Sequence, residues 1–139
     1  MDTTTHHEPL SAAALAGVTD LPVGRLGEGL AARHLGIDGL EVLARNWRVA
    51  EGELRGELDL IAVERATSTL VVCEVKTRRD ADRFGGACAA LDPRKHRRLR
   101  ALTAAFLRAQ PHRYAHVRLD LVAIDLGRCA GLTHLVGLA

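Results

Sequence analysis

The chain has 139 residues, of which 47% are hydrophobic and 26% are charged, and its formal net charge is only +2. This composition excludes a disordered chain, and no apolar run approaches the length of a membrane span. We therefore expect one globular domain at residues 21–139, long enough to bury a single core without disulfide or metal staples.

The cysteines and the first residues of the chain indicate a cytoplasmic protein. Cys73, Cys88 and Cys129 are odd in number and lack metal-type spacing, which favours a reducing compartment. Residues 11–18 are apolar like the core of a signal peptide, but no Lys or Arg precedes them. We expect residues 1–20 to form a flexible leader.

The first expected element is a helix at residues 23–35, which Gly36 can terminate. Gly24, Gly27 and Ala31 lie on one stripe of this helix, which favours close packing against a sheet. Three strands rich in β-branched and apolar residues follow it. Their expected ranges are 40–50, 56–64 and 69–77.

A second helix is expected from Asp92 and Pro93, an N-cap acid followed by Pro at the first helical position, to about Arg108. Strands at 116–126 and 132–138 complete the order α-β-β-β-α-β-β. This order predicts an α/β fold, with a mixed sheet of four to five strands flanked by helices.

Ionisable residues interrupt two of the apolar strands. Glu57 and Asp59 share one face of the second strand, and Glu74 and Lys76 share one face of the third, because side chains alternate across a strand. The loop at 65–68 would fold the two strands into an antiparallel hairpin. We therefore expect Asp59 to lie close to Glu74, with Glu57 and Lys76 at the same end.

Two carboxylates held close together repel each other and raise at least one pKa, unless a cation lies between them. Mg²⁺ or Mn²⁺ would suit such a site, because hard divalent ions prefer carboxylate oxygens. Lys76 would then hold a phosphate oxygen or help to activate the attacking water, as in phosphodiester hydrolysis. Two simpler readings stay open: charged strand positions that face solvent, and a structural ion-pair network.

The second helix indicates a nucleic-acid partner. Lys95 continues the core-facing stripe of this helix towards the expected site. The surrounding arginines lie in the first turns, at the positive end of the helix dipole, where a phosphate partner would offset their repulsion. A solvated basic face is the alternative. The expected nucleic-acid-binding residues are Arg78, Arg94, Lys95, Arg97, Arg98 and Arg100.

Other cofactor classes find little support. His6 and His7 lie in the expected leader, and ligand spacing with Cys or acids is missing at His96, His112, His116 and His134, which argues against a zinc site. No Gly-rich phosphate loop follows any expected strand, which argues against nucleotide hydrolysis.

The spacing of Asp59, Glu74 and Lys76 is similar to the D…(D/E)xK signature of restriction-endonuclease-like nucleases, although Leu58 replaces the Pro that often precedes the Asp. Several longer motifs resemble the bacterial YraN family of uncharacterised proteins, whose core is similar to archaeal Holliday-junction resolvases. These motifs are GRLGEGLAARHL, LARNWR, GELDLIA, VVCEVKTR, FGGA, DPRKHRRL and LDLVAI, which together span residues 24–125.

The resemblance implies a role for each matching residue. Asp59, Glu74 and Glu28 would be metal ligands, and Lys76 would be the catalytic lysine. Glu57 matches the Gly-Glu-x-Asp motif with a less certain role. The pattern of the helix agrees for Glu28, since its stripe carries small apolar residues that would face the sheet. An exposed acid facing an arginine is the alternative.

We therefore expect a Mg²⁺- or Mn²⁺-dependent endonuclease acting on DNA, with branched DNA the favoured substrate and RNA an open alternative. Resolvase-like cutting of two strands would favour a two-fold homodimer. Two other functions fit the sequence: a nucleic-acid-binding module of the same fold without catalysis, and a protein-interaction subunit.

Overall fold

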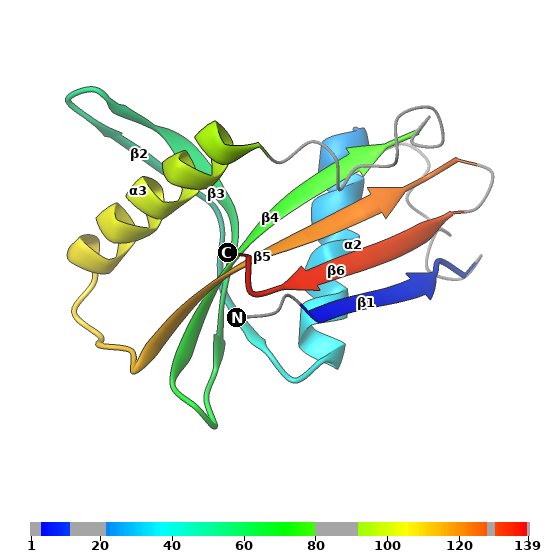
Figure 1. Ribbon diagram of the computed structural model, residues 1–139, viewed down its shortest axis with the longest axis horizontal. Coiled ribbons are helices and arrows are strands. Elements are labelled where there is room, and N and C mark those ends of the chain that lie inside the picture. The colour runs from blue at the N-terminus through cyan, green and yellow to red at the C-terminus, as the bar shows by residue number, and fades with distance from the viewer. Residues whose placement is uncertain (1–3, 12–21, 80–91, 128–129, 139) are drawn as a thin grey trace.

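The structure is a computed structural model that describes residues 4–11, 22–79, 92–127 and 130–138. Within these ranges, six strands and two helices follow one another along the chain (Figure 1). Their bounds are β1 Thr4–Pro9, α2 Val23–Ile37, β2 Glu41–Glu51, β3 Leu54–Glu64, β4 Thr69–Arg78, α3 Pro93–Ala109, β5 His116–Asp125 and β6 Gly131–Val136. The two helices and five strands expected from the sequence are all present, with bounds that shift by a few residues.

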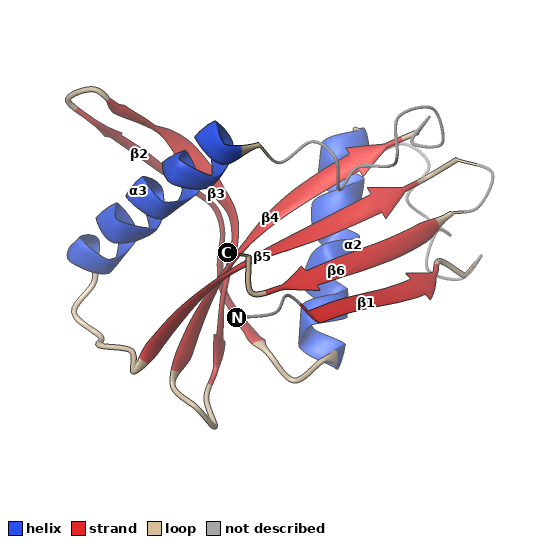
Figure 2. Ribbon diagram, viewed as in Figure 1, coloured by secondary structure: helices blue, strands red, loops and turns tan. Residues whose placement is uncertain are grey.

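All six strands belong to one mixed sheet with the order β1-β6-β5-β4-β3-β2. β4 and β5 are parallel and are connected through α3, whereas the other neighbouring pairs are antiparallel. α2 packs on one face of the sheet, and α3 crosses the opposite face beside the β2–β3 hairpin (Figure 2). The expected α/β class, with a mixed sheet flanked by helices, is confirmed.

Alternation along β4 supplies both hydrophobic cores. Leu70 and Val72 pack with α3, whereas Val71 and Cys73 pack with α2. All four side chains are buried. A strand covered on both faces needs apolar residues at consecutive positions, which explains the continuous apolar run in this part of the sequence.

Local signals set the ends of the helices. The carboxylate of Asp92 caps α3 by accepting a hydrogen bond of 2.9 Å from the backbone N–H of Lys95. α2 continues through Gly36, where we expected it to stop, and Gly39 supplies the left-handed residue after its end, with φ of 90°. Neither described helix is long and apolar enough to cross a bilayer.

The N-terminal strand is the main difference from the expected order. Residues 4–9 of the expected leader pair antiparallel with β6, so the order is β-α-β-β-β-α-β-β. The sheet consequently has six strands instead of four or five. Every side chain of β1 is exposed, so no hydrophobic alternation marks this strand in the sequence. Residues 12–21 and the FGGA motif at 84–87 lie outside the described residues.

The alternation of side chains between the two hydrophobic cores is interrupted in β3 at Asp59. Leu60 and Ala62 pack under α2, but Leu58 packs under α3, although residues two apart in a regular strand share a face. The pairing of β3 with β4 also begins only at Leu60, which lies opposite Cys73. Asp59 therefore lies where the two strands separate.

α2 comes very close to β4 at Gly27. A Cβ at Gly27 would lie 1.7 Å from the Oγ1 atom of Thr77, so only a glycine fits without a shift of the helix or strand. A Cβ at Gly24 or Gly29 would meet nothing within 4 Å. The close packing expected for this helix thus holds at Gly27 and not at Gly24, and it places the turn that carries Glu28 against the sheet.

We predict that Gly27→Ala lowers the free energy of unfolding by about 1–2 kcal/mol, because overpacking against Thr77 outweighs the better helix propensity of Ala. Gly29→Ala in the same helix is the matched control, and it should leave stability unchanged or raise it. Urea unfolding followed by circular dichroism measures both variants. Equal stability of the two would show that the close approach does not constrain the fold.

Candidate functional site

Four acidic side chains come together where β3 separates from β4. Glu57 and Asp59 belong to β3, Glu74 to β4 and Glu28 to α2. Carboxylate oxygens of Glu28, Glu57 and Asp59 all lie within 4.8 Å of one another. Glu74 interacts electrostatically with Asp59, and all four side chains are partly buried. The structure thus gathers the four acids that the sequence marked as site residues.

A backbone hydrogen bond holds Asp59 in place. Its Oδ2 atom accepts a hydrogen bond of 2.9 Å from the backbone N–H of Val75 in β4. The Asp59 side chain therefore bridges the two strands at the point where their backbone pairing has ended. A side chain held in this way loses little further freedom when it binds a ligand.

Burial and mutual repulsion raise the pKa of two of these acids. Burial raises the pKa of Asp59 to about 6, and the nearby charges of Glu28 and Glu57 add to the increase. Burial likewise raises the pKa of Glu74 to about 7, and the charge of Asp59 contributes next. The hydrogen bond from Val75 and the positive charge of Lys76 only partly oppose the shift at Asp59. The cluster has more negative charge than its surroundings stabilise, so a cation would bind favourably here.

Two lysines from different elements lie beside Glu74. The Nζ atom of Lys76 is 3.9 Å from Oε1 of Glu74. The nearby ammonium group of Lys76 also lowers the pKa of Lys95 in the first turn of α3. The expectation that Lys95 extends towards this end of the sheet is therefore consistent with the geometry. Two adjacent ammonium groups favour an anion between them.

Glu57 already has a partner within the fold. The Nε atom of Arg48 in β2 donates a hydrogen bond of 2.8 Å to Oε2 of Glu57. The arginine side chain is 79% exposed, so this ion pair contributes little to stability. It nevertheless orients the carboxylate of Glu57.

The arginines expected to bind nucleic acid do not share one face of α3. Arg94 and Arg97 are exposed. Arg98 donates a hydrogen bond to the backbone carbonyl of Arg55 and so packs against the β2–β3 hairpin. Arg100 lies on the opposite flank of the helix, towards β5. Arg78, the last residue of β4, is exposed.

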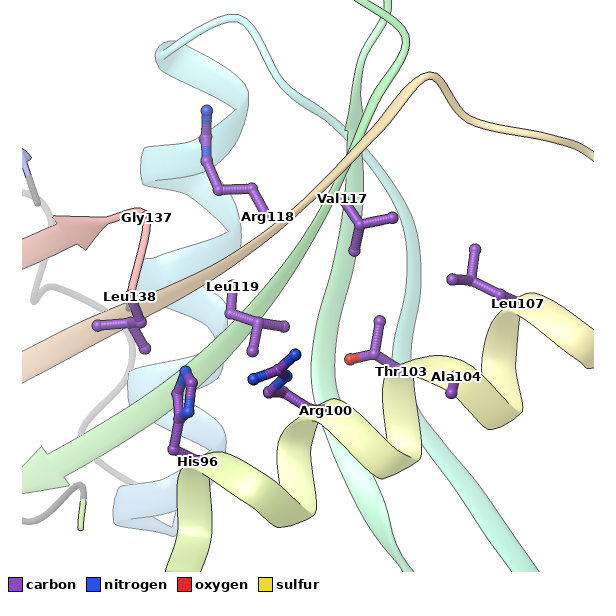
Figure 3. Close-up of a pocket in the computed structure, with 10 residues that line it drawn as sticks. All are labelled: His96, Arg100, Thr103, Ala104, Leu107, Val117, Arg118, Leu119, Gly137 and Leu138. Carbon is purple, nitrogen blue, oxygen red and sulfur yellow. The ribbon is translucent and has the colours of Figure 1, made fainter. Parts of the chain in front are cut away.

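A groove of about 530 Å³ lies between α3 and β5. Figure 3 shows Arg100 and His96 of α3 projecting towards Leu119 of β5, with Leu138 beside His96. Most of the lining is apolar, and none of the four clustered acids contributes to it. Arg100 is therefore placed in a different environment from the lysines beside Glu74.

A second polar cluster was not recognised in the sequence. Asp120 and His134 are both fully buried, and the ligand atoms of His34, Asp38 and His134 lie within 4.8 Å of one another. We expected no ligand arrangement among the histidines, because their spacing along the chain shows none. The sequence does hold one indication of a buried polar group. Asp120 stands in a Leu-Asp-Leu triplet like the one around Asp59.

Comparison with known proteins identifies the family. The sequence model of UPF0102, an uncharacterised protein family, matches residues 27–124. A UPF0102 protein of Mycobacterium ulcerans (strain Agy99) is 46% identical over 122 residues, covering 86% of this chain and 96% of the relative. Another, from Mycobacterium avium (strain 104), is 46% identical over 123 residues, covering 87% and 92%. The chain belongs to the UPF0102 family, which confirms the expected membership in an uncharacterised bacterial family.

We predict that, with chelator present, the free energy of unfolding falls as the pH rises from about 5 to 8. Asp59 and Glu74 titrate near 6 and 7 in the folded protein and near 3.8 and 4.5 otherwise, so the folded state binds more protons in this range. The effect should be on the order of 2 kcal/mol. Urea unfolding at pH 5 and pH 8 measures it.

The matched control for this experiment is the double variant Asp59→Asn, Glu74→Gln, which removes both titrations. It should show a smaller loss of stability between pH 5 and pH 8, and at pH 8 it should be more stable than the wild type. An equal pH dependence in the two proteins would contradict the raised pKa values.

Proposed function

We propose that this UPF0102 protein is a Mg²⁺- or Mn²⁺-dependent endonuclease that hydrolyses phosphodiester bonds in DNA, with branched DNA as the favoured substrate. The observation that carries the proposal is the meeting of the Glu28, Glu57 and Asp59 carboxylates within 4.8 Å, beside Glu74 and Lys76. The arrangement resembles that of restriction-endonuclease-like nucleases, whose core fold we propose for this domain as well.

The donor set fits a hard divalent cation. Carboxylate oxygens are the ligands that Mg²⁺ and Mn²⁺ prefer, and the site offers neither thiolate nor imidazole among its described residues. Asp59, Glu74 and Glu28 would hold the ion, and Glu57 would support them or add a ligand. When bound, the ion supplies positive charge that stabilises the developing charge on the phosphate.

The protein's own groups would perform the remaining steps. Lys76 is close enough to Glu74 to share a ligand with it, and its ammonium group would donate to a phosphate oxygen or orient the attacking water. Lys95, adjacent to Lys76, would neutralise a second phosphate oxygen. Asp59 is fixed by its bond from Val75, so the carboxylates are preorganised for a ligand.

Backbone phosphates would bind along the first turns of α3. Arg94 and Arg97 are exposed, no acid lies in the first turn of the helix, and Lys95 connects this surface to the acidic cluster. Arg78 would extend the surface beyond the end of β4. Contacts of this kind recognise shape and charge and not base sequence, which suits a structure-selective enzyme. Cutting both strands of a junction would require two such sites, as in a two-fold homodimer.

A second candidate is a DNA-binding module without catalysis. The observation in its favour is the ion pair between Arg48 and Glu57, because a carboxylate that already has a cationic partner has less need of a metal ion. The basic surface of α3 would then carry the whole function. Cleavage assays separate the two candidates directly.

We predict metal-dependent cleavage of a labelled panel of four-way junction, flap, duplex, single-stranded DNA and RNA. Asp59→Asn, Glu74→Gln and Lys76→Ala should each reduce the cleavage rate by about 10²- to 10⁴-fold, because each removes a ligand or a proton-handling group. Glu53→Gln, an exposed acid in the turn between β2 and β3, is the control and should retain activity. Binding of all substrates without cleavage, under Mg²⁺ and under Mn²⁺, would favour the non-catalytic module.

We predict that Arg94→Ala with Arg97→Ala weakens DNA binding at every sequence and reduces the slope of log K against log salt by about 2. The control is Arg113→Ala, an exposed arginine beyond the C-terminal end of α3. Fluorescence anisotropy measures the binding constant at salt concentrations from about 50 to 200 mM, and the slope follows from these values. An unchanged slope in the double variant would place the DNA surface elsewhere.

A further inference from the structure

The α2 side of the sheet contains a chain of polar groups away from the acidic cluster. The Nε2 atom of His134 in β6 is 2.7 Å from Oδ2 of Asp120 in β5. The Nδ1 atom of His134 is 3.0 Å from Nε2 of His34 near the end of α2. The Nδ1 atom of His34 is in turn 3.2 Å from a carboxylate oxygen of Glu8 in β1. Each imidazole therefore has one nitrogen on a carboxylate and one facing the other ring.

Asp120 fixes the tautomer of His134. Its Oδ1 atom accepts hydrogen bonds from Nε of Arg118 and the backbone N–H of Gly137, and its Oδ2 atom accepts one from the second guanidinium nitrogen of Arg118. An ionised carboxylate only accepts hydrogen bonds, so Nε2 of His134 carries the proton. The Nδ1 atom then presents a lone pair to His34.

The same reasoning applies to His34. Its Nδ1 atom donates to the carboxylate of Glu8, which leaves a lone pair on Nε2. The two lone pairs are then 3.0 Å apart, and they repel unless a proton lies between them or both nitrogens bind a metal ion beside the line that joins them. Metal-binding histidines characteristically donate their other ring N–H to a carboxylate, as both of these do.

We propose that His34, His134 and Asp38 bind a transition-metal ion of the zinc class, with Asp120 and Glu8 as the carboxylates that orient the two imidazoles. Zinc–nitrogen bonds of about 2.0–2.1 Å in a tetrahedral site place two ligand nitrogens about 3.3 Å apart, close to the observed separation. A carboxylate oxygen of Asp38 lies within 4.8 Å of one ring nitrogen of each histidine, and Asp38 would complete three protein ligands. A water molecule or another small ligand would take the fourth position.

The surroundings favour a cation and leave it a route of entry. Asp38 follows the last turn of α2, where the negative end of the helix dipole attracts positive charge. A cavity of about 170 Å³ reaches His34 between Glu8, Leu30 and Ile37. The His34 side chain is 10% exposed, so the ion can enter from this side while His134 stays buried.

This site differs from the acidic cluster in its chemistry and its position. Imidazole nitrogens favour zinc over Mg²⁺, whereas the acidic cluster offers only oxygens. Glu28 and His34 are six residues apart on α2, or about 9 Å along the helix axis. Glu8 and His134 also lie outside residues 27–124, the range that matches the family. A bound ion would connect β6, and through Glu8 also β1, to α2.

Calorimetric titration of the full-length, chelator-treated protein with Zn²⁺ tests the site. We expect one ion per chain, at micromolar affinity or tighter, in the wild type and in the Asp59→Asn, Glu74→Gln double variant. His34→Gln should weaken binding at least 100-fold, Asp38→Asn about 10-fold, and Glu8→Gln about 10-fold by loosening the orientation of His34. His116→Gln, an exposed histidine at the start of β5, is the matched control and should bind as the wild type does.

Two further readouts distinguish this site from others in the chain. Zn²⁺ should raise the melting temperature of the wild type and of His116→Gln but not of His34→Gln. Bound Co²⁺ should show no thiolate charge-transfer absorption, because no cysteine takes part. If His34→Gln does not fold, exposed Asp38→Asn decides the outcome. Absence of zinc binding by the wild type, equal affinity in the Asp38→Asn variant, or a thiolate spectrum would each overturn the proposal.

Discussion

The candidate site depends on the point at which β3 separates from β4. Backbone pairing between the two strands reaches Leu60 and Cys73 and goes no further, and the side chain of Asp59 then accepts the hydrogen bond from Val75. An acid in the middle of the sheet would have been covered by a helix on either face. At the separation it remains only partly buried, so it keeps its affinity for a cation while its pKa is raised.

Both helices place charged side chains at the point where β3 and β4 separate. A local feature of the sequence holds each helix there. The absence of a side chain at Gly27 lets α2 approach Thr77, which brings Glu28 to the carboxylates. The Asp92 cap begins α3 at a point where Lys95 lies beside Lys76. Acids from one helix and cations from the other therefore meet across the end of β4. The division of charge gives the site an acidic side and a basic side, which the proposed function would use for a metal ion and for phosphate.

The sequence predicted those parts of the molecule in which a local pattern carries the information. Acids that interrupt apolar strands revealed Asp59 and Glu74, and the short loop between those strands fixed their antiparallel pairing. β1 was missed because its exposed polar side chains give no alternation. The His34–His134 contact was missed because it joins residues 100 positions apart. Asp120 shows the limit most clearly, since its Leu-Asp-Leu triplet matches that of Asp59. Only the fold reveals that its partners are His134, Arg118 and the backbone N–H of Gly137.

The two ionisable clusters differ in how far their surroundings stabilise the negative charge of a buried carboxylate. Arg118, His134 and the backbone N–H of Gly137 keep Asp120 ionised, so its charge is already satisfied and can orient an imidazole. Asp59 and Glu74 lack such compensation, and their raised pKa values record the deficit. A satisfied carboxylate is a good support for a nitrogen ligand, whereas an unsatisfied pair is itself a good ligand for a hard cation. The distribution of donors around each acid would therefore separate the two kinds of metal chemistry that we propose for this sheet.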